Sequence, residues 1–249
     1  MKSVLYSEWL KLKRSKALLS CSLGTCIVPL FVLFNSIQRY LKNPSETIDL
    51  FGLYDGALLF LMLLFAPLAL SVIAAYTICR EYSEKTLKTI FTVPVSRMQF
   101  LAGKFCILFM ITILFMLISW FHILILAVLC SFFVEVGQLT PVSAVFFLMK
   151  MLSGALLLYM TLTPIVYFSI RNKGFTAPFI VSAAVCLFNV VLSGSGIAGW
   201  FPWTASYLLI NGRSGHAGCP PHISFLIIVC LCVISVSAST VRFLREDIS

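Results

Sequence analysis

Charged residues are scarce in this sequence. Only 11% of its 249 residues are Asp, Glu, Lys or Arg, whereas 60% are hydrophobic. A soluble domain of ordinary composition carries about 25% charged residues. The composition therefore excludes a soluble globular protein and predicts an all-α polytopic membrane protein.

A nucleotide-binding motif is also missing. The sequence contains no G-x-x-x-x-G-K-[ST] pattern, which is the motif that cradles phosphates in P-loop ATPases. The stretch "GSGIAG" at residues 194–199 fits the dinucleotide fingerprint letter for letter. That fingerprint requires a preceding strand, and here it closes an apolar run, so we interpret the match as chance. We expect no cofactor in this chain, and ATP-driven work would require another chain to bind the nucleotide.

The cysteines do not form the pattern of a disulfide scaffold. Nine are present, and only Cys219 lies in a polar loop, while the others lie in or beside apolar runs, where cysteine behaves as a small hydrophobe. His216, Cys219 and His222 have a metal-like spacing. A zinc site needs three or four ligands held by a folded frame. A short loop with two prolines is not expected to supply such a frame. We expect no metal.

Ionisable side chains are missing from the interior of the apolar runs. Intramembrane catalysis would be expected to place such groups there, because they are costly and usually functional. No Asp, Glu, Lys or Arg lies deep inside a run, and His122 and Asn189 are the side chains there that could carry chemistry. We interpret His122 as a packing or hydrogen-bonding residue, with a proton relay as the alternative, and Asn189 as a link between helices. The sequence therefore predicts no catalytic residue.

What the sequence has instead is six apolar runs, each long enough for the roughly 20 residues that cross a bilayer. Pro67, Pro164 and Pro178 lie inside or at the start of runs and predict kinks whose freed carbonyls find other partners. We expect one transmembrane domain over residues 1–249. The predicted spans are residues 17–37, 53–78, 105–133, 145–170, 177–199 and 223–241.

The positive charges are distributed unevenly between the two predicted sides. Fourteen of the 18 Lys and Arg residues lie before the first run, in residues 80–104, in residues 171–173 and after the last run. The other side carries four, namely Arg39, Lys42, Lys150 and Arg213. The positive-inside rule then places both termini in the cytoplasm. Because topology explains the net charge of +9, we expect membrane lipid and no nucleic acid as a partner.

One polar island, "REYSEKTLKTIFTVPVSR" at residues 80–97, separates the second and third runs. Leu87, Ile90 and Phe91 have the spacing of one apolar helix face, and Pro94 would end that helix. We predict an amphipathic helix at the cytoplasmic surface. It could simply stabilise the loop, or it could dock a cytoplasmic partner.

Charge spacing supports the same helix. Glu81 and Glu84 each have a lysine four residues later, in the favourable order with the acid first. At the N-terminus, "LYSEWLKLKRSK" places Leu5, Trp9 and Leu12 on one face. This pattern predicts an interfacial helix within residues 1–16.

The island resembles a known segment. "E81-Y-S-E-K-T86-L87…P94-V-S96-R97…K104" is similar to the coupling segment of permease subunits of type-2 ABC exporters. Lys85 stands where that family usually has glycine, so continuous helix replaces a tight turn. The N-terminal segment is similar to the elbow helix before the first span. The resemblance covers the whole chain and implies a set of ATPase-coupling residues. These are Glu81, Glu84, Thr86, Leu87, Ile90, Phe91, Pro94 and Arg97.

The resemblance also implies partners. Two permease chains would form the pore in a bacterial plasma membrane, and two ATPase chains would dock beneath it and hold ATP and Mg²⁺. The second permease could be another copy of this chain or a different chain. ATP binding would move the coupling helix, and the spans would shift between states.

The cargo is the least specified part. "SEWLKLKRS" together with the outer "FPW" resembles permeases of lantibiotic and bacitracin immunity and resistance, which implies export of a peptide antibiotic or another amphiphile. Trp200, Trp203 and Asn189 are the candidate substrate contacts, although interfacial tryptophans are common in any membrane protein. A multidrug or lipid exporter of the same fold, and a permease that transmits a signal without moving cargo, are the alternatives.

Overall fold

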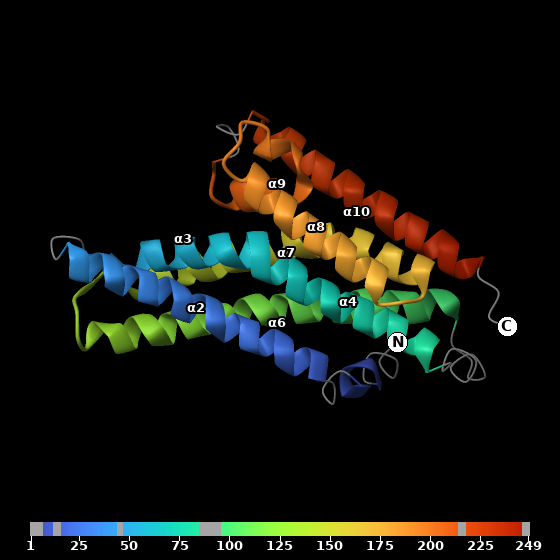
Figure 1. Cartoon of the computed structure of the whole chain (residues 1–249), viewed down its shortest axis with the longest axis horizontal. Helices are drawn as coiled ribbons and strands as arrows, with labels where there is room; N and C mark the ends of the chain where they lie inside the picture. Colours follow the sequence, from blue (N-terminus) through green and yellow to red (C-terminus); the bar gives the residue numbers. More distant parts are fainter. Residues whose placement is uncertain (1–6, 12–15, 44–46, 85–95, 214–217, 246–249) are drawn as a thin grey trace.

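The computed structural model describes residues 7–11, 16–43, 47–84, 96–213 and 218–245. Within these ranges, long helices follow one another with short connections (Figure 1). A helical stretch at residues 7–11 comes first. The helices that follow are α2 (Lys16–Lys42), α3 (Leu50–Phe60), the π-helix η1 (Leu61–Phe65), α4 (Ala66–Ser83), α6 (Arg97–Ser131), α7 (Pro141–Asn172), α8 (Thr176–Leu192), the 3₁₀-helix η2 (Ala198–Trp200), α9 (Pro202–Ile210) and α10 (Pro221–Leu244).

Four helical stretches in the described part of the chain are long and apolar enough to cross a membrane. They are Leu50–Ser83, Arg97–Ser131, Pro141–Asn172 and Pro221–Leu244. α8 is apolar but has 17 residues. α2 has 27 residues, with Arg39 and Lys42 in its last turn. The chain is thus a helical multi-pass membrane protein, as expected, whereas six spans and the orientation of the termini stay predictions.

The helices share two ends. α4 and α7 end, and α6 and α8 begin, at one end of the molecule, on the right in Figure 1; we call this end the base. At the opposite end, β1 (Ile48–Asp49) pairs in parallel with β2 (Val136–Gly137), which joins the α2–α3 connection to the α6–α7 connection. We call this opposite end the strand end. These strands have only two residues each, too few for a sequence pattern to predict them.

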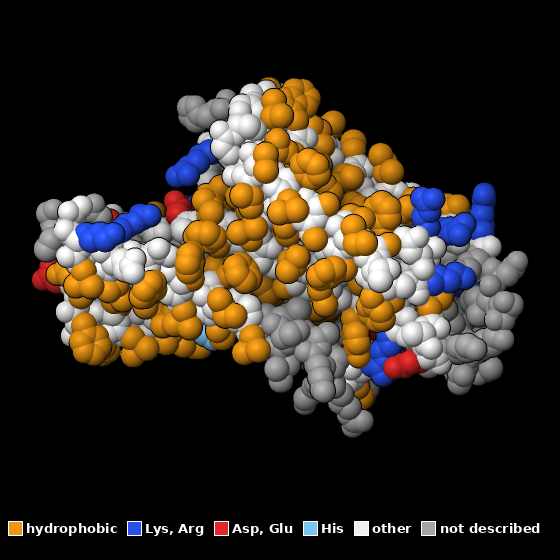
Figure 2. Space-filling model, in the orientation of Figure 1, with side chains coloured by type: hydrophobic (Ala, Val, Ile, Leu, Met, Phe, Trp, Pro, Cys, Tyr) orange, Lys and Arg blue, Asp and Glu red, His pale blue; other side chains and the backbone are white. Residues whose placement is uncertain are grey.

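Hydrophobic side chains cover most of the middle of the face shown in Figure 2, and Lys and Arg lie toward its ends. This distribution is expected for helices that run through a bilayer, because charged groups are costly in its hydrocarbon core. Inside, α7 packs against α4, α6 and α10. Phe147 of α7 is fully buried and stacks on Tyr54 of α3 with ring centroids 4.4 Å apart. α7 is therefore the central helix of the packing.

The predicted accommodation of proline is confirmed at two positions. Pro67 has no N–H to donate to the Leu63 carbonyl four residues earlier, and the chain widens into the π-helix η1 just before it. Asn189 of α8 donates its side-chain N–H to that carbonyl at 2.9 Å. In α7, Thr163 donates its hydroxyl to the carbonyl of Met160, which Pro164 leaves free, at 2.8 Å. The interpretation of Asn189 as a link between helices is confirmed.

The fifth predicted span, residues 177–199, is wrong at its C-terminal end. α8 ends at Leu192, because the following "SGSG" has two glycines that disfavour helix. The chain then forms η2 and a second short helix, α9, which begins with Pro202 at a position where proline suits a helix start and packs against α7 and α10. Sequence reasoning missed α9 because its nine residues are too few for a hydropathy window.

The second predicted span is shorter than the helix that contains it, and the third begins inside its helix but extends past the end of that helix at Ser131. The predicted span 105–133 belongs to a helix that begins at Arg97, where Ser96 and Gln99 form a capping box. The predicted span 53–78 lies within continuous helix from Leu50 to Ser83. Hydropathy detects only the apolar part of a helix, so it places the polar ends of these helices in loops.

Candidate functional site

Four charged side chains come together at the base, beside the connection between α4 and α6. Glu8 and Lys11 come from the helical stretch 7–11. Glu81 lies in the last turn of α4, and Lys104 lies about two turns into α6. We call them the ion-pair cluster. Lys104 is 2% exposed, and the two glutamates are 3% exposed each. Buried charges are tolerated only when they are paired, and here they are.

Lys104 is the centre of the ion-pair cluster. Its ammonium group carries three N–H donors and has three acceptors within reach. These are Glu8 Oε2 at 2.5 Å, Glu81 Oε1 at 3.0 Å and the Thr77 carbonyl at 2.8 Å. Every donor of the buried ammonium is therefore used, and α6 is tied both to α4 and to the N-terminal segment.

Lys11 completes the charge balance. Its Nζ lies 2.8 Å from Glu81 Oε1 and 3.1 Å from Glu8 Oε1. Burial by itself would lower the pKa of Lys11, but the hydrogen bond from Lys11 to Glu81 and the negative charges of Glu8 and Glu81 outweigh it and raise that pKa above 10.5. Two carboxylates thus face two ammonium groups, and the segment carrying Glu8 and Lys11 is fixed to the base.

Helix periodicity explains the local part of this arrangement. Thr77 and Glu81 are four residues apart on α4, and Phe100 and Lys104 are four apart on α6, so each pair lies on one helix face. The Lys104 ammonium also lies 5.1 Å from the ring centroid of Phe100. Sequence spacing gives these faces, but it does not say that three faces from distant parts of the chain meet.

The predicted coupling residues have different surroundings. Glu81 was expected to pair with Lys85 and to face an ATPase, but it is buried with Lys11 and Lys104 as partners, so its carboxylate holds helices together at the base. Glu84 is exposed and pairs with Arg80 at 2.8 Å. Thr86, Leu87, Ile90, Phe91 and Pro94, and most of the predicted coupling helix 80–97, lie outside the described residues.

Arg97 and the predicted elbow helix also meet the rest of the base. Arg97 donates from Nη1 to the carbonyl of Leu244, at the end of α10, at 3.1 Å. Its helix α6 therefore holds the last helix of the chain. Trp9 packs half-buried against the hydrophobic core, whereas Leu5 and Leu12 lie outside the described residues.

The three candidate substrate residues lie in different environments. Trp200 is exposed and donates its indole N–H to the Gly218 carbonyl at 3.2 Å. Trp203 is half-buried, and its indole N–H has no acceptor in the described part of the chain. Asn189 is fully buried against η1. The structure thus brings Trp200 and Trp203 near one another in η2 and α9, and it gives Asn189 a packing role.

No metal-binding group appears among the described residues: nowhere in them do three His, Cys, Asp or Glu side chains gather suitably. Cys219 is buried, His222 is exposed, and His216 lies outside the described residues. The ring of His122 in α6 faces the thiol of Cys26 in α2, with Nε2 3.3 Å from Sγ. This contact agrees with a hydrogen-bonding role for His122.

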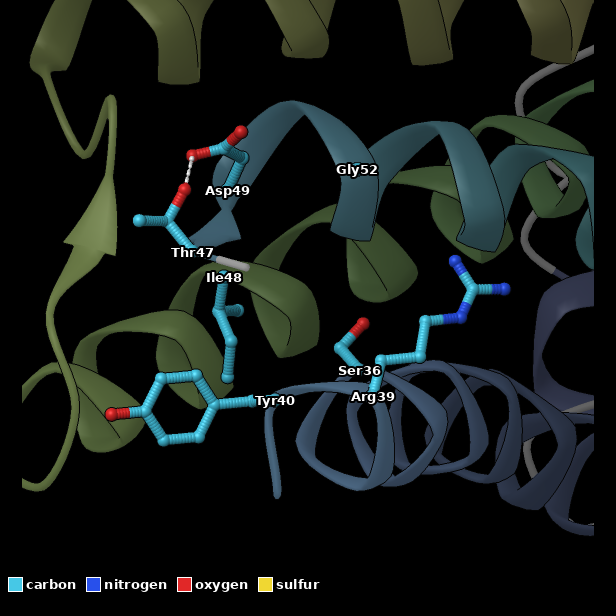
Figure 3. Close-up of a pocket in the computed structure, with 7 residues that line it drawn as sticks. All are labelled: Ser36, Arg39, Tyr40, Thr47, Ile48, Asp49 and Gly52. Carbon is cyan, nitrogen blue, oxygen red and sulfur yellow. Dashed lines mark hydrogen bonds between the residues drawn. The ribbon is translucent and has the colours of Figure 1, made fainter. Parts of the chain in front are cut away.

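A second polar feature lies at the strand end. A cavity of about 170 Å³ opens between α2, β1 and α3 (Figure 3). Sequence reasoning missed it, because its polar side chains come from an ordinary-looking loop and from the last turns of α2. The lining residues are Ser36, Arg39, Tyr40, Thr47, Ile48, Asp49 and Gly52.

Known proteins show similarity over most of the chain. Residues 4–191 match the family described as ABC-2 family transporter protein. The chain is also 27% identical to the bacitracin transport permease protein of Bacillus licheniformis over 211 residues, which cover 83% of this chain and 97% of that relative. The family match includes the ion-pair cluster and the connection between α4 and α6. We conclude that the chain belongs to the ABC-2 family of transporter proteins, as a membrane permease that resembles those of bacitracin resistance.

Proposed function

We propose that this chain is the transmembrane subunit of an ATP-driven exporter in a bacterial plasma membrane. ATP and Mg²⁺ would be bound by a separate ATPase pair docked at the base, which faces the cytoplasm in the predicted six-span topology. The second permease in the complex is either another copy of this chain or a different chain. The observation that carries the proposal is the ion-pair cluster, since it lies where the family's coupling segment begins and ends.

The ion-pair cluster would transmit movement. The segment that joins α4 to α6 starts just after Glu81 and ends before Lys104, and these two side chains are bound to each other. A partner that displaced the segment would therefore move α4 and α6 together. It would also move the N-terminal segment through Glu8 and Lys11.

A further connection would extend the movement to the end of the chain. Arg97 begins α6 and donates to the carbonyl of Leu244, the last residue of α10. Displacement of α6 would thus reach α10 without passing through the apolar core. A partner can shift such an equilibrium only if its contacts differ between the two states. The exposed Glu84 at the end of α4 is the described side chain best placed for such a contact.

The proposed cargo is a bacitracin-like peptide, a lantibiotic or another amphiphile. It is supported by the relative, whose name states bacitracin transport, and by the "SEWLKLKRS" and "FPW" resemblance. Trp203 is the stronger of the tryptophan candidates, because its N–H lacks an acceptor among the described residues. Multidrug or lipid export, or signalling without export, would use the same base.

A pull-down with a resistance assay tests the proposal. The tagged chain is purified from gently solubilised membranes of its own host, and its partners are identified by mass spectrometry. We expect a co-purifying ATPase, and we expect deletion of the gene to lower bacitracin resistance until the wild type is restored. An ATPase without a change in resistance would favour another cargo or a signalling role, and absence of any ATPase would refute the proposal.

Two matched variants separate docking from folding. Glu84→Arg reverses an exposed charge and should weaken ATPase recovery while the permease inserts normally. Glu81→Arg would instead place a third cation beside Lys11 and Lys104, so it would disrupt the base itself. Glu81→Gln keeps the shape of the buried side chain, so it is a better control than Glu81→Arg for the effect of changing the ion-pair cluster alone. Normal ATPase recovery with Glu84→Arg would rule out docking through that side chain.

A further inference from the structure

The strand-end pocket carries two charges of opposite sign. In Figure 3, Arg39 extends from α2 on one side of the cavity, and the Asp49 carboxylate lies beside Thr47 on another. Asp49 accepts a hydrogen bond from the Thr47 hydroxyl at 3.3 Å. In the part of the chain that the structure describes, no ion pair involves Arg39 or Asp49. Among the described residues, neither charge has an ionic partner, and the Asp49 carboxylate lies between Thr47 and Gly137 of β2.

One wall of the strand-end pocket has no side chain. Gly52 lies within the helix α3, and a Cβ built on it would meet no other atom within 4 Å. Glycine is a poor helix former, so the helix itself does not favour it here. Its effect is to leave the hollow open, and a larger side chain at this position would enter the cavity without displacing backbone.

Exposed apolar side chains occur on α2 and α3, the two helices that form the strand-end pocket with β1. Leu41, which follows Tyr40, is 72% exposed, and Phe51, which precedes Gly52, is 40% exposed. The pocket itself lies at the end of helices that cross the membrane. A polar hollow with one cation and one anion, on helices that also expose apolar side chains, suits an amphiphile whose head carries one positive and one negative charge.

We propose that the strand-end pocket binds the headgroup of a zwitterionic phospholipid. The phosphate would accept hydrogen bonds from Arg39, whose guanidinium suits phosphate oxygens, and from the hydroxyl of Ser36. The ammonium group would lie against Asp49, and the acyl chains would run along the exposed apolar surface of α2 and α3, to which Leu41 and Phe51 belong. An anionic lipid without an ammonium group would leave Asp49 uncompensated. This inference goes beyond the proposed export function and does not depend on an ATPase.

Lipid retention by the purified chain tests the pocket. The permease is delipidated in neutral detergent, and dioleoylphosphatidylethanolamine or dioleoylphosphatidylglycerol is added. Bound lipid is then measured by native mass spectrometry. The variants are Gly52→Trp, which fills the pocket, Gly52→Ala as its matched control, Arg39→Gln and Asp49→Asn. Because Gly52 has open space beside it, both Gly52 variants should fold, and size-exclusion profiles verify that they do.

The expected result is specific for each variant. The wild type and Gly52→Ala should retain phosphatidylethanolamine over phosphatidylglycerol, and Gly52→Trp should lose about tenfold in affinity, equivalent to 1.4 kcal/mol. Arg39→Gln should weaken both lipids, whereas Asp49→Asn should abolish the preference between them. Equal retention by the wild type and Gly52→Trp would overturn the proposal. If the wild type showed no preference between the two lipids and the dipeptide Ala-Ala displaced bound lipid, the proposal would also be overturned, in favour of a peptide ligand.

Discussion

Lys104 has three N–H donors and three acceptors at 2.5 to 3.0 Å, in a place that solvent hardly reaches. Its neighbours Glu8 and Glu81 depend on it in turn, since each carboxylate is almost wholly buried. Such a group adds little net stability over an apolar replacement of the whole set, but it is costly to break by removing one member. Substitution of a single residue in the ion-pair cluster should therefore have a large and measurable effect on stability.

Substitution of Lys104 by methionine should strongly destabilise the chain. Glu8 and Glu81 would be left with Lys11 alone, and loss of one partner from a buried ion pair costs about 3–5 kcal/mol. The measurement is thermal unfolding in detergent. Arg80→Ala is the control, because the exposed Arg80–Glu84 pair is worth about 0–1 kcal/mol. Equal effects of the two substitutions would contradict the buried cluster.

Lys11 should keep its charge throughout the neutral range. Because its folded-state pKa is raised above 10.5, its contribution to stability is complete below that pH and is lost only as pH rises through the folded value. Acetylation of amines between about pH 7 and 9, followed by mass spectrometry, should modify Lys11 more slowly than the exposed Lys42. Glu81→Gln should speed the reaction at Lys11. Equal rates at Lys11 and Lys42 would disprove the pairing.

At the scale of elements, the membrane helix of residues 50–83 is irregular at the junction of η1 and α4. Pro67 removes one backbone donor, the π-helix takes up the change in spacing, and Asn189 of α8 supplies the missing hydrogen bond to Leu63. π-bulges are frequent at functional positions in helices. Here the bulge accepts a hydrogen bond from Asn189, so the packing of α8 depends on the helix that contains η1.

Replacement of Asn189 by leucine should cost about 1–3 kcal/mol, because the buried Leu63 carbonyl would lose its partner. Pro67→Ala restores an N–H four residues after Leu63, so the double variant should recover part of this loss. A double-mutant cycle on thermal unfolding measures the coupling between the two positions. Strictly additive effects would show that Asn189 does not serve the carbonyl freed by Pro67.

At the scale of the whole molecule, the base and the strand end lie on opposite sides of the apolar middle (Figures 1 and 2). The base holds the ion-pair cluster and the ends of α4, α6 and α10. The strand end holds β1, β2 and the strand-end pocket. The proposed export function would need this separation, because the ATPase would act from one side of the membrane and the cargo would leave on the other.

Single cysteines should report the predicted topology. With all native cysteines replaced, Arg213→Cys in the connection after α9 should react with a membrane-impermeant maleimide added to intact cells. Ser83→Cys, exposed at the base, should react only after the cells are opened. Labelling of Ser83→Cys in intact cells would reverse the assigned orientation.

Composition, hydropathy and the distribution of Lys and Arg determined by themselves that the chain is a helical multi-pass membrane protein, because these properties act locally along the chain. The motif from Glu81 to Lys104 likewise pointed to the correct transporter family. Only the tertiary structure decided that Glu81 is buried, that Lys104 joins it to Glu8, and that Asn189 serves η1. The partners in these contacts come from helices far apart in sequence, and no periodicity within one helix encodes which faces will meet.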